Sequence, residues 1–298
     1  MKARMLTTVG LMLIACPITR ASNVPATELR ARAEQGDAKA QFDLGMALYQ
    51  GNGVRQNYRE AAKWFERAAQ QGLTDAMNNM GLVYAEGQGV KQDYHKSLEW
   101  YKRAADAGNA GAQYNLGVAY DFGRGVKQDH HEAAGWYEKA ALQGYRNAQN
   151  SLGSLYQFGQ GVEQNDGKAV EWYQKSADQG QPDAVVNLAY MYLTGRGVEK
   201  NEAKAFELNL KMANKGYPRA MLNAGIQLRD GQGTPQDYEQ AWNLLNQVRL
   251  ASRDSDLGWK AVAALDQIKT DLGVEKTLGR FSYPEWKVVQ KSIRQKKK

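Results

Sequence analysis

The sequence predicts an all-α protein: six helix–turn–helix repeats of 36 residues, with a capping helix at each end. Two observations indicate this fold, namely residue identities that recur every 36 positions and helical patterns that lie between recurring glycines. An alanine and a glycine each keep this spacing through six copies, at Ala40, Ala76, Ala112, Ala148, Ala184 and Ala220, and at Gly36, Gly72, Gly108, Gly144, Gly180 and Gly216. Chance does not keep six copies in register, so the array accounts for most of the 298 residues.

Each repeat contains two predicted helices. In the second copy, residues 73–86 place apolar side chains three and four positions apart, which is typical of an amphipathic helix. Gly87-Gln88-Gly89 follows and ends this helix, because glycine adopts the left-handed conformation easily. A second helix is expected over residues 94–106, with Asp93 as its N-cap. The other copies carry capping residues at the same position: Asn57, Asp129, Asn165, Asn201 and Asp237.

A glycine in the middle of the first helix needs a physical reason, because it costs about 1 kcal/mol relative to alanine. Five copies have one, at Gly45, Gly81, Gly117, Gly153 and Gly225. We expect close helix–helix contact, with an aromatic ring resting on the bare backbone, and the predicted rings are Trp64, Trp100, Trp136 and Trp172. Recurrent amides at Asn79, Asn115, Asn187 and Asn223 are predicted to be buried and bonded to the backbone of the next repeat.

The segments on either side of the six repeats are predicted to be capping elements and a C-terminal tail. Residues 22–34 resemble half a repeat and are expected to cap the six repeats at 35–250, with Leu29 and Ala33 on its buried side. Residues 251–272 are predicted to form the C-terminal capping helix, and residues 273–298 a basic, aromatic tail. Trp286, Val289 and Ile293 share one side of that tail. Four interpretations of the tail remain open: it docks on the last repeat, contacts anionic lipid, binds an acidic partner or stays solvated.

The first 21 residues are interpreted as an export signal. Lys2 and Arg4 precede an 11-residue apolar run that is too short to cross a bilayer as a helix. Cleavage after Ala21 predicts a periplasmic protein. Alternatively, the segment before Cys16 resembles a lipobox, in which case Cys16 is lipidated and the protein is anchored to the outer membrane. An uncleaved membrane anchor is the third interpretation.

The basic charge is confined to the two ends of the chain. The first 20 residues carry a net charge of +3 and residues 275–298 carry +6, so the remainder is −2 within a total of +7. A nearly neutral body has no positive stripe along which to bind phosphates, and a nucleic-acid partner is therefore not expected.

The repeat pattern resembles that of the Sel1-like repeats, relatives of the tetratricopeptide repeat, over residues 35–250. The residues of the third copy that carry the resemblance are Ala112, Leu116, Gly117, Tyr120, Gly123, Gly125, Val126, Asp129, Ala133, Trp136, Tyr137, Ala140 and Ala141. The resemblance implies a right-handed α-solenoid that binds proteins or peptides, and exported bacterial relatives are similar in acting as envelope scaffolds, signalling regulators or host-interaction factors. Cysteine-rich relatives imply penicillin-binding or β-lactamase-like activity, but they have a disulfide in each repeat, whereas this chain has only Cys16.

No catalytic or metal site is predicted, and no cofactor. The histidines His95, His130 and His131 are interpreted as solvated residues at helix starts, and no Ser/His/Asp grouping has a useful spacing. The Gly-x-Gly motifs follow helices rather than strands, so they are read as helix stops and not as phosphate loops.

The predicted function is therefore that of a non-enzymatic, monomeric scaffold that binds an unidentified protein or peptide. A secreted host-interaction factor is the alternative. Three positions of the first helix vary between copies and share one face, which the resemblance places on the concave side. Six residues at these positions are the predicted contacts: Phe42, Met46, Tyr49, Tyr114, Tyr190 and Leu193. The competing interpretation is that several of them pack between adjacent repeats.

Overall fold

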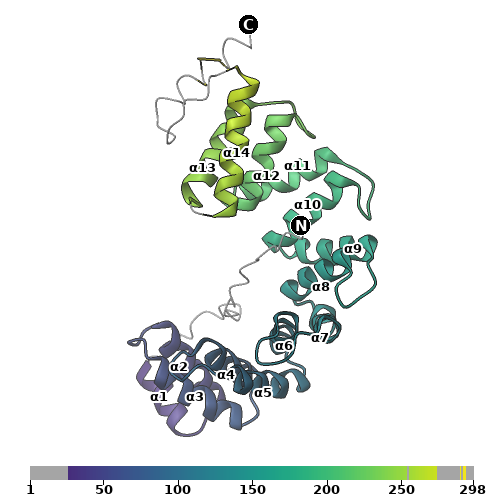
Figure 1. Cartoon of the computed structure of the whole chain (residues 1–298). Helices are drawn as coiled ribbons and strands as arrows, with labels where there is room; N and C mark the ends of the chain where they lie inside the picture. Colours follow the sequence, from purple (N-terminus) through teal and green to yellow (C-terminus); the bar gives the residue numbers. More distant parts are fainter. Residues whose placement is uncertain (1–25, 254, 274–288, 290, 293–298) are drawn as a thin grey trace. The chain divides into compact units, whose positions relative to one another are not determined.

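The computed structural model describes residues 26–253, 255–273, 289 and 291–292, and the regular structure of these residues is entirely α-helical (Figure 1). The predicted all-α repeat fold is confirmed. The helices are α1 (Ala26–Glu34), α2 (Ala38–Gln50), α3 (Tyr58–Gln70), α4 (Thr74–Glu86), α5 (Tyr94–Asp106), α6 (Ala110–Phe122), α7 (His130–Leu142), α8 (Arg146–Phe158), α9 (Asp166–Asp178), α10 (Pro182–Thr194), α11 (Glu202–Ala213), α12 (Pro218–Asp230), α13 (Tyr238–Ala251) and α14 (Asp256–Asp271).

The chain separates into two compact units. The first contains residues 1–148 and 160–162, and the second contains residues 149–159 and 163–298, so the division falls within α8. We call them unit 1 and unit 2 and describe each by itself.

Each repeat joins its two helices through a loop that the two glycines of the Gly-x-Gly motif make possible. In the third repeat Gly123 has φ +66°, and its N–H donates to the carbonyl of Ala119 to end α6. Gly125 lies so close to the start of α5 that a Cβ there would be 2.7 Å from the carbonyl oxygen of Tyr94. The first glycine therefore stops the helix, and the second lets the loop contact the preceding repeat.

The second helix of each repeat begins at the predicted N-cap. The Asp129 carboxylate accepts from the backbone N–H groups of His131 and Glu132, and this lowers its pKa, chiefly through the Glu132 bond. The other five caps also accept backbone N–H bonds: Asn57, Asp93, Asn165, Asn201 and Asp237. All six capping predictions are confirmed.

The mid-helix glycines allow close packing between the two helices of a repeat, as expected. A Cβ on Gly117 would lie 2.6 Å from Cδ1 of Tyr137, far inside van der Waals contact, so the tyrosine ring rests on bare backbone. The predicted ring was wrong by one position. The side chains that cover these glycines are Phe65, Tyr101, Tyr137, Tyr173 and Leu245, not the tryptophans.

The tryptophans lie one residue earlier and therefore about 100° around the helix. Each stacks against a basic side chain three residues later, at 3.7 to 4.6 Å from ring centroid to cation. The pairs are Trp64 with Arg67, Trp100 with Arg103, Trp136 with Lys139, and Trp172 with Lys175. The tryptophan rings therefore lie at the edge of the core, and not over the glycines at its centre.

The fifth repeat replaces both partners of the glycine contact. Ala189 stands where the other copies have glycine, and Asn209 stands where they have an aromatic or leucine side chain. Both residues are buried, and the Asn209 Nδ2 donates to Oε1 of buried Gln227 at 2.7 Å. The fifth repeat therefore adds a methyl group at Ala189 of α10 and has a smaller side chain opposite it, Asn209 of α11.

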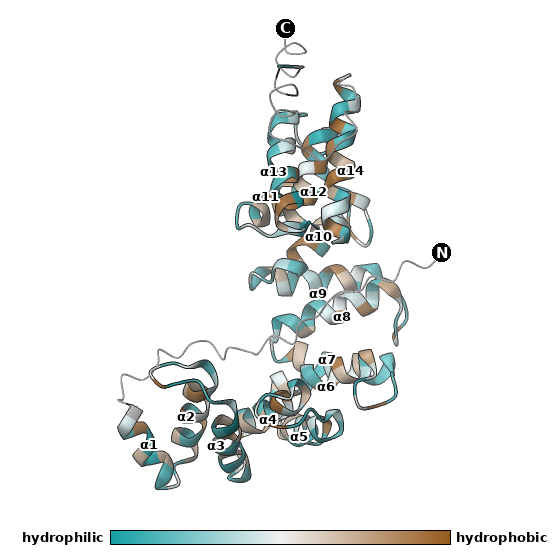
Figure 2. Ribbon diagram, turned by 60° about the vertical axis from the view of Figure 1, so that its left-hand side comes forward, coloured by the Kyte–Doolittle hydropathy of each residue, from teal (hydrophilic) through white to brown (hydrophobic). Residues whose placement is uncertain are grey.

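Both ends of the array are covered by helices that bury apolar side chains. Leu29 and Ala33 of α1 join the core of unit 1, together with Phe65 of α3. In unit 2, Leu265 and Ile268 of α14 pack with α12 and α13, and Figure 2 shows hydrophobic stretches on α12 and α14. Val289 is fully buried in the same cluster, so this position of the predicted tail packs against the fold. Trp286 and Ile293, with residues 1–25, lie outside the described residues.

We predict that Gly117→Ala will lower the free energy of unfolding by about 1–3 kcal/mol, because the new methyl group must displace the Tyr137 ring. Urea unfolding followed by circular dichroism measures the effect. Gly135→Ala is the matched control, since Gly135 is exposed in the middle of α7 and has nothing within 4 Å of a new Cβ. It should instead stabilise the protein by about 0.5–1 kcal/mol. Equal effects of the two substitutions would contradict the packing role.

Candidate interaction surface

The three variable positions of the first helices define the candidate surface, which we call the first-helix face. Half of its residues are buried: Phe42, Tyr49, Asn78, Leu82, Ala85, Val118, Gln157, Val186 and Leu222. The rest are half-buried or exposed: Met46, Tyr114, Asp121, Asn150, Ser154, Tyr190, Leu193, Ile226 and Arg229. The face therefore combines packing between helices with accessible side chains.

The third variable position of each first helix, held by Asp121 in the third repeat, changes together with the aromatic ring that covers the mid-helix glycine. The Tyr137 hydroxyl donates to Oδ2 of Asp121 at 3.1 Å, and the Tyr173 hydroxyl donates to Oε1 of Gln157 at 2.7 Å. The second repeat has Ala85 at this position, and the buried hydroxyl of Tyr101 has no hydrogen-bond partner. This position changes with its structural neighbour and does not by itself indicate a binding role.

The first variable position of the first helices holds an asparagine in two repeats, Asn78 and Asn150, and each one bonds an asparagine of the following repeat. Nδ2 of Asn115 donates to Oδ1 of Asn78 at 2.9 Å, and Nδ2 of Asn187 donates to Oδ1 of Asn150 at 3.0 Å. The prediction that these asparagines bond the backbone of the next repeat is wrong. Asn115 and Asn187 bond side-chain amides of the preceding repeat, and Asn79 bonds the sulfur of Met46 there, because equivalent first helices lie side by side.

Three predicted contacts in unit 1 serve the packing of the first two repeats. Phe42 is 5% exposed and Tyr49 is 4% exposed, and both rings lie against Phe65 of α3. The Tyr49 hydroxyl donates to Glu86, a carboxyl group whose pKa is raised by its burial. Met46 is half-buried, and its sulfur accepts from Nδ2 of Asn79 at 3.1 Å. Phe42 and Tyr49 are therefore core residues in this structure, and we do not retain them as anchors.

Tyr114 is half-buried within a group of three tyrosines. Its ring lies 5.6 Å from that of Tyr137 and 5.2 Å from that of Tyr145. Burial raises the pKa of Tyr145, so its hydroxyl remains protonated in the folded protein. Tyr114 thus closes an aromatic cluster and presents only part of its ring to solvent.

Tyr190 is the predicted contact that the structure leaves most accessible, with 44% of its surface exposed on α10. Leu193, one turn further along α10, is half-buried. Two arginines lie on the neighbouring elements. Arg196 makes a bidentate pair with Asp166 at 2.8 and 3.0 Å, and Arg219 donates to Asp183 at 2.7 Å.

Hydrogen bonds to neighbouring side chains orient both arginines. The pKa of Arg196 is raised, first by the hydrogen bond with Asp166 and also by one with Tyr190. Arg219 also reaches Oδ1 of Asn187, which lies one turn from Tyr190 on α10. Tyrosine and arginine are both enriched among the residues that contribute most to protein interfaces. Sequence reasoning missed both arginines: Arg196 lies inside a Gly-x-Gly motif that was interpreted only as a helix stop, and Arg219 has no arginine at the same position in any other copy.

The described residues contain no group of three or more histidine, cysteine or carboxylate side chains arranged to hold a metal ion. In the same part of the chain, no helix is both long and apolar enough to cross a bilayer.

These features define an α-solenoid repeat protein, a scaffold fold that typically serves protein–protein interaction. The Sel1 repeat family model matches residues 38–73, 74–109, 110–145, 146–181, 182–217 and 218–247. The chain belongs to the Sel1 repeat family.

Two solved structures and one related sequence support this assignment. A protective antigen of uropathogenic Escherichia coli strains with an SLR fold is 37% identical, with a TM-score of 0.71 over 84% of this chain and 58% of the antigen. A Sel1 repeat protein from Oxalobacter formigenes is 29% identical, with a TM-score of 0.68 over 74% of this chain and 89% of that one. The secretory immunoglobulin A-binding protein EsiB of Escherichia coli O6:H1 strain CFT073 is 44% identical over 46 residues, which are 15% of this chain and 9% of EsiB.

We predict that Ala85→Gln will raise the free energy of unfolding by about 0.5–1.5 kcal/mol, because it supplies the acceptor that Tyr101 lacks. Burial raises the pKa of Tyr101, so the hydroxyl keeps its proton to donate. The control is the same substitution in a Tyr101→Phe background, where no hydroxyl remains and the gain should vanish. A gain of equal size in both backgrounds, measured by urea unfolding, would show that the effect has another origin.

Proposed function

We propose that this protein is an exported, non-enzymatic scaffold that binds a protein or peptide partner through the first-helix face of unit 2. The observation that carries the proposal is Tyr190, an exposed aromatic side chain that adjoins ion-paired Arg196, on a helix whose Asp183 and Asn187 hold Arg219. Tyrosine and arginine supply most of the energy in protein interfaces, because each combines a large contact area with directed hydrogen bonds. The ion pairs hold the arginines in place before a partner arrives, which limits the entropy lost on binding.

The relatives support binding to a protein. EsiB is named for binding secretory immunoglobulin A, and the similar antigen is described as protective. The chain covers 58% of the antigen, and its matched segment covers 9% of EsiB, so the partners of these whole proteins enter as candidates to test. They support a second candidate function, a secreted factor that contacts host proteins.

The export step rests on the sequence of residues 1–21. We propose that the charged start, the short apolar run and Ala21 direct the chain to the periplasm, with lipidation at Cys16 as the competing route.

We predict that a photo-cross-linking amino acid at position 190 will form adducts with the partner protein when the living source cells are irradiated. Leu250 is the matched control, because it is 46% exposed and lies in the last turn of α13, away from the first-helix face. The same adduct from both positions, or from neither, would contradict the proposed surface. Purified secretory immunoglobulin A is the first candidate to test directly. Tyr190→Ala should weaken its binding about tenfold or more while leaving the thermal midpoint within about 2 °C.

We also predict that the exported protein begins at Ser22, with Ala21 as the last residue removed. Intact-mass spectrometry of the periplasmic fraction measures this directly. Cys16→Ser is the control, since it abolishes lipidation and should leave a soluble route unaffected. A mature chain that begins at acylated Cys16 would replace the soluble route with membrane anchoring, and retention of residues 1–21 in the cytoplasm would refute export.

A further inference from the structure

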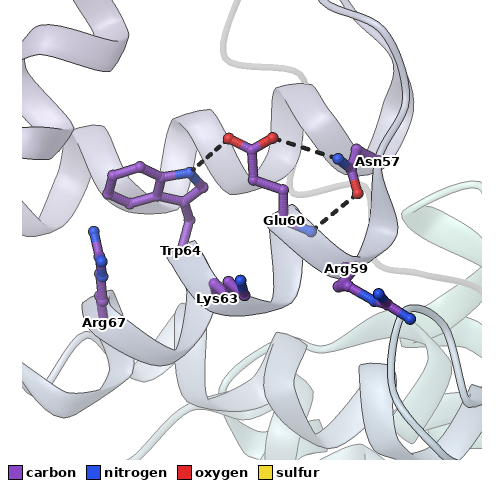
Figure 3. A pocket seen from close by; sticks show the side chains of 6 residues that line it. All are labelled: Asn57, Arg59, Glu60, Lys63, Trp64 and Arg67. Atoms are coloured by element: carbon purple, nitrogen blue, oxygen red, sulfur yellow. Dashed lines mark hydrogen bonds between the residues drawn. The ribbon is translucent and has the colours of Figure 1, made fainter.

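The first-helix face does not account for a second surface, on the outside of α3. Arg59, Lys63 and Arg67 are all exposed and follow one another at intervals of four residues. On a helix this spacing places them in one row, about 6 Å apart along the axis. They line an open pocket of about 360 Å³, together with Asn57, Glu60 and Trp64 (Figure 3).

The acidic residue in this pocket is already neutralised from elsewhere. Glu60 pairs with Arg30 of α1 at 2.8 Å, and it also accepts from Nε1 of Trp64 at 3.5 Å. Figure 3 shows Glu60 turned toward Trp64 and Asn57. Among the residues that the structure describes, no carboxylate forms an ion pair with Arg59, Lys63 or Arg67. The row therefore keeps its three positive charges.

Trp64 fixes one end of the row. The Arg67 guanidinium lies 4.6 Å from the centre of the indole ring, a cation–π contact that restrains a side chain otherwise free to move. An oriented guanidinium loses less entropy when it binds a carboxylate. The row is thus partly ordered in advance at Arg67.

Comparison within the chain shows that the row is particular to α3. The middle position, held by Lys63, is Glu99, Gly135, Glu171, Glu207 and Asn243 in the other five repeats. A glutamate there lies four residues before a cation in α5, α9 and α11, which stabilises a helix, whereas like charges at this spacing destabilise it. The first repeat instead has a cation there, three residues from Glu60 and from Glu66, so that its helix stays stable while the row remains basic.

The segments of this chain that lie outside the described residues are poor candidates to cover the row. Residues 1–25 contain Lys2, Arg4 and Arg20 and no acidic residue, and residues 274–288, 290 and 293–298 carry seven basic residues against two acidic ones. Charge repulsion disfavours both. A separate, negatively charged molecule fits the row better.

We propose that α3 is a docking site for an extended acidic segment of a partner protein, with carboxylates at every second residue that pair with Arg59, Lys63 and Arg67. Alternate side chains of an extended strand lie on one side and about 6.6 Å apart, which matches the spacing of the row. Bidentate carboxylate–guanidinium bonds at Arg59 and Arg67 give the contact its direction. This site goes beyond the function proposed for Tyr190 and lies on a different element, so either one can fail while the other stands.

The test uses the full chain and a fluorescent, terminally blocked heptapeptide, Ser-Glu-Ser-Glu-Ser-Glu-Ser, with anisotropy measured at low salt. We expect binding that weakens with added salt and that is lost when the three glutamates become glutamines. A peptide of the same composition with its glutamates adjacent should bind less tightly. Absence of binding to the alternating peptide, or equal binding of the two arrangements, would overturn the proposal.

Lys63→Glu supplies the decisive variant. It should weaken binding about tenfold while leaving the thermal midpoint within about 2 °C, because new pairs with Arg59 and Arg67 offset the repulsion from Glu60 and Glu66. A structural defect would lower the midpoint instead. Lys102→Glu is the matched control, since Lys102 is exposed on α5 of the same unit and occupies a position that holds Glu66 and Glu138 in neighbouring repeats. Equal weakening by both variants would reduce the effect to net charge and refute the site.

Two further probes separate the acidic segment from other anions. A single-stranded oligonucleotide of equal charge and phosphatidylglycerol vesicles are measured against the same two variants. Tighter binding of either one, sensitive to Lys63→Glu but not to Lys102→Glu, would assign the row to phosphates and overturn the acidic-segment proposal.

Discussion

The fold depends on one repeated contact, in which a ring or leucine side chain of the second helix rests on a bare glycine of the first. At Gly117 there is no room for a single methyl group beside Tyr137. Glycine weakens an isolated helix by about 1 kcal/mol, so the first helices gain their stability from packing rather than from intrinsic propensity. The contact brings two backbones together without a polar group, and the alanines of both helices then fill the rest of the interface.

This contact sets the positions of the other side chains. Because the ring points inward, the tryptophan one residue earlier is turned to the edge of the second helix, where it stacks on a cation. Because the ring is often tyrosine, its hydroxyl reaches the far end of the first helix and needs an acceptor there, which Asp121 and Gln157 provide. Asn209 in the fifth repeat removes the ring altogether, and Ala189 then becomes possible. One contact thus explains both the constant positions and part of the variation between copies.

Sequence periodicity predicted the six helix pairs, their caps and their glycine stops, because each depends on local chemistry repeated in register. It did not distinguish Trp136 from Tyr137 as the ring over Gly117, since neighbouring aromatics differ only by a rotation of about 100° that depends on how the helices meet. It also misassigned the partners of the recurrent asparagines, because the alignment of Asn115 with Asn78 follows from the stacking of repeats. Phe42 and Tyr49 were predicted as anchors from variability, yet their burial depends on Phe65, a neighbour on another helix.

These outcomes show which departures from a repeat carry information about function. A variable residue that is buried, such as Tyr49, is explained by another residue of the same chain, here Glu86. A variable residue that is exposed and has no partner of its own in the described residues, such as Lys63, has no such explanation within the structure. Tyr190 is intermediate, because it is exposed yet adjoins Arg196, which also serves Asp166. In a protein whose core repeats, the search for a binding surface therefore begins with exposed positions at which one copy reverses the charge that most other copies carry, and Lys63 of α3 meets this condition because three of the other five copies have glutamate there.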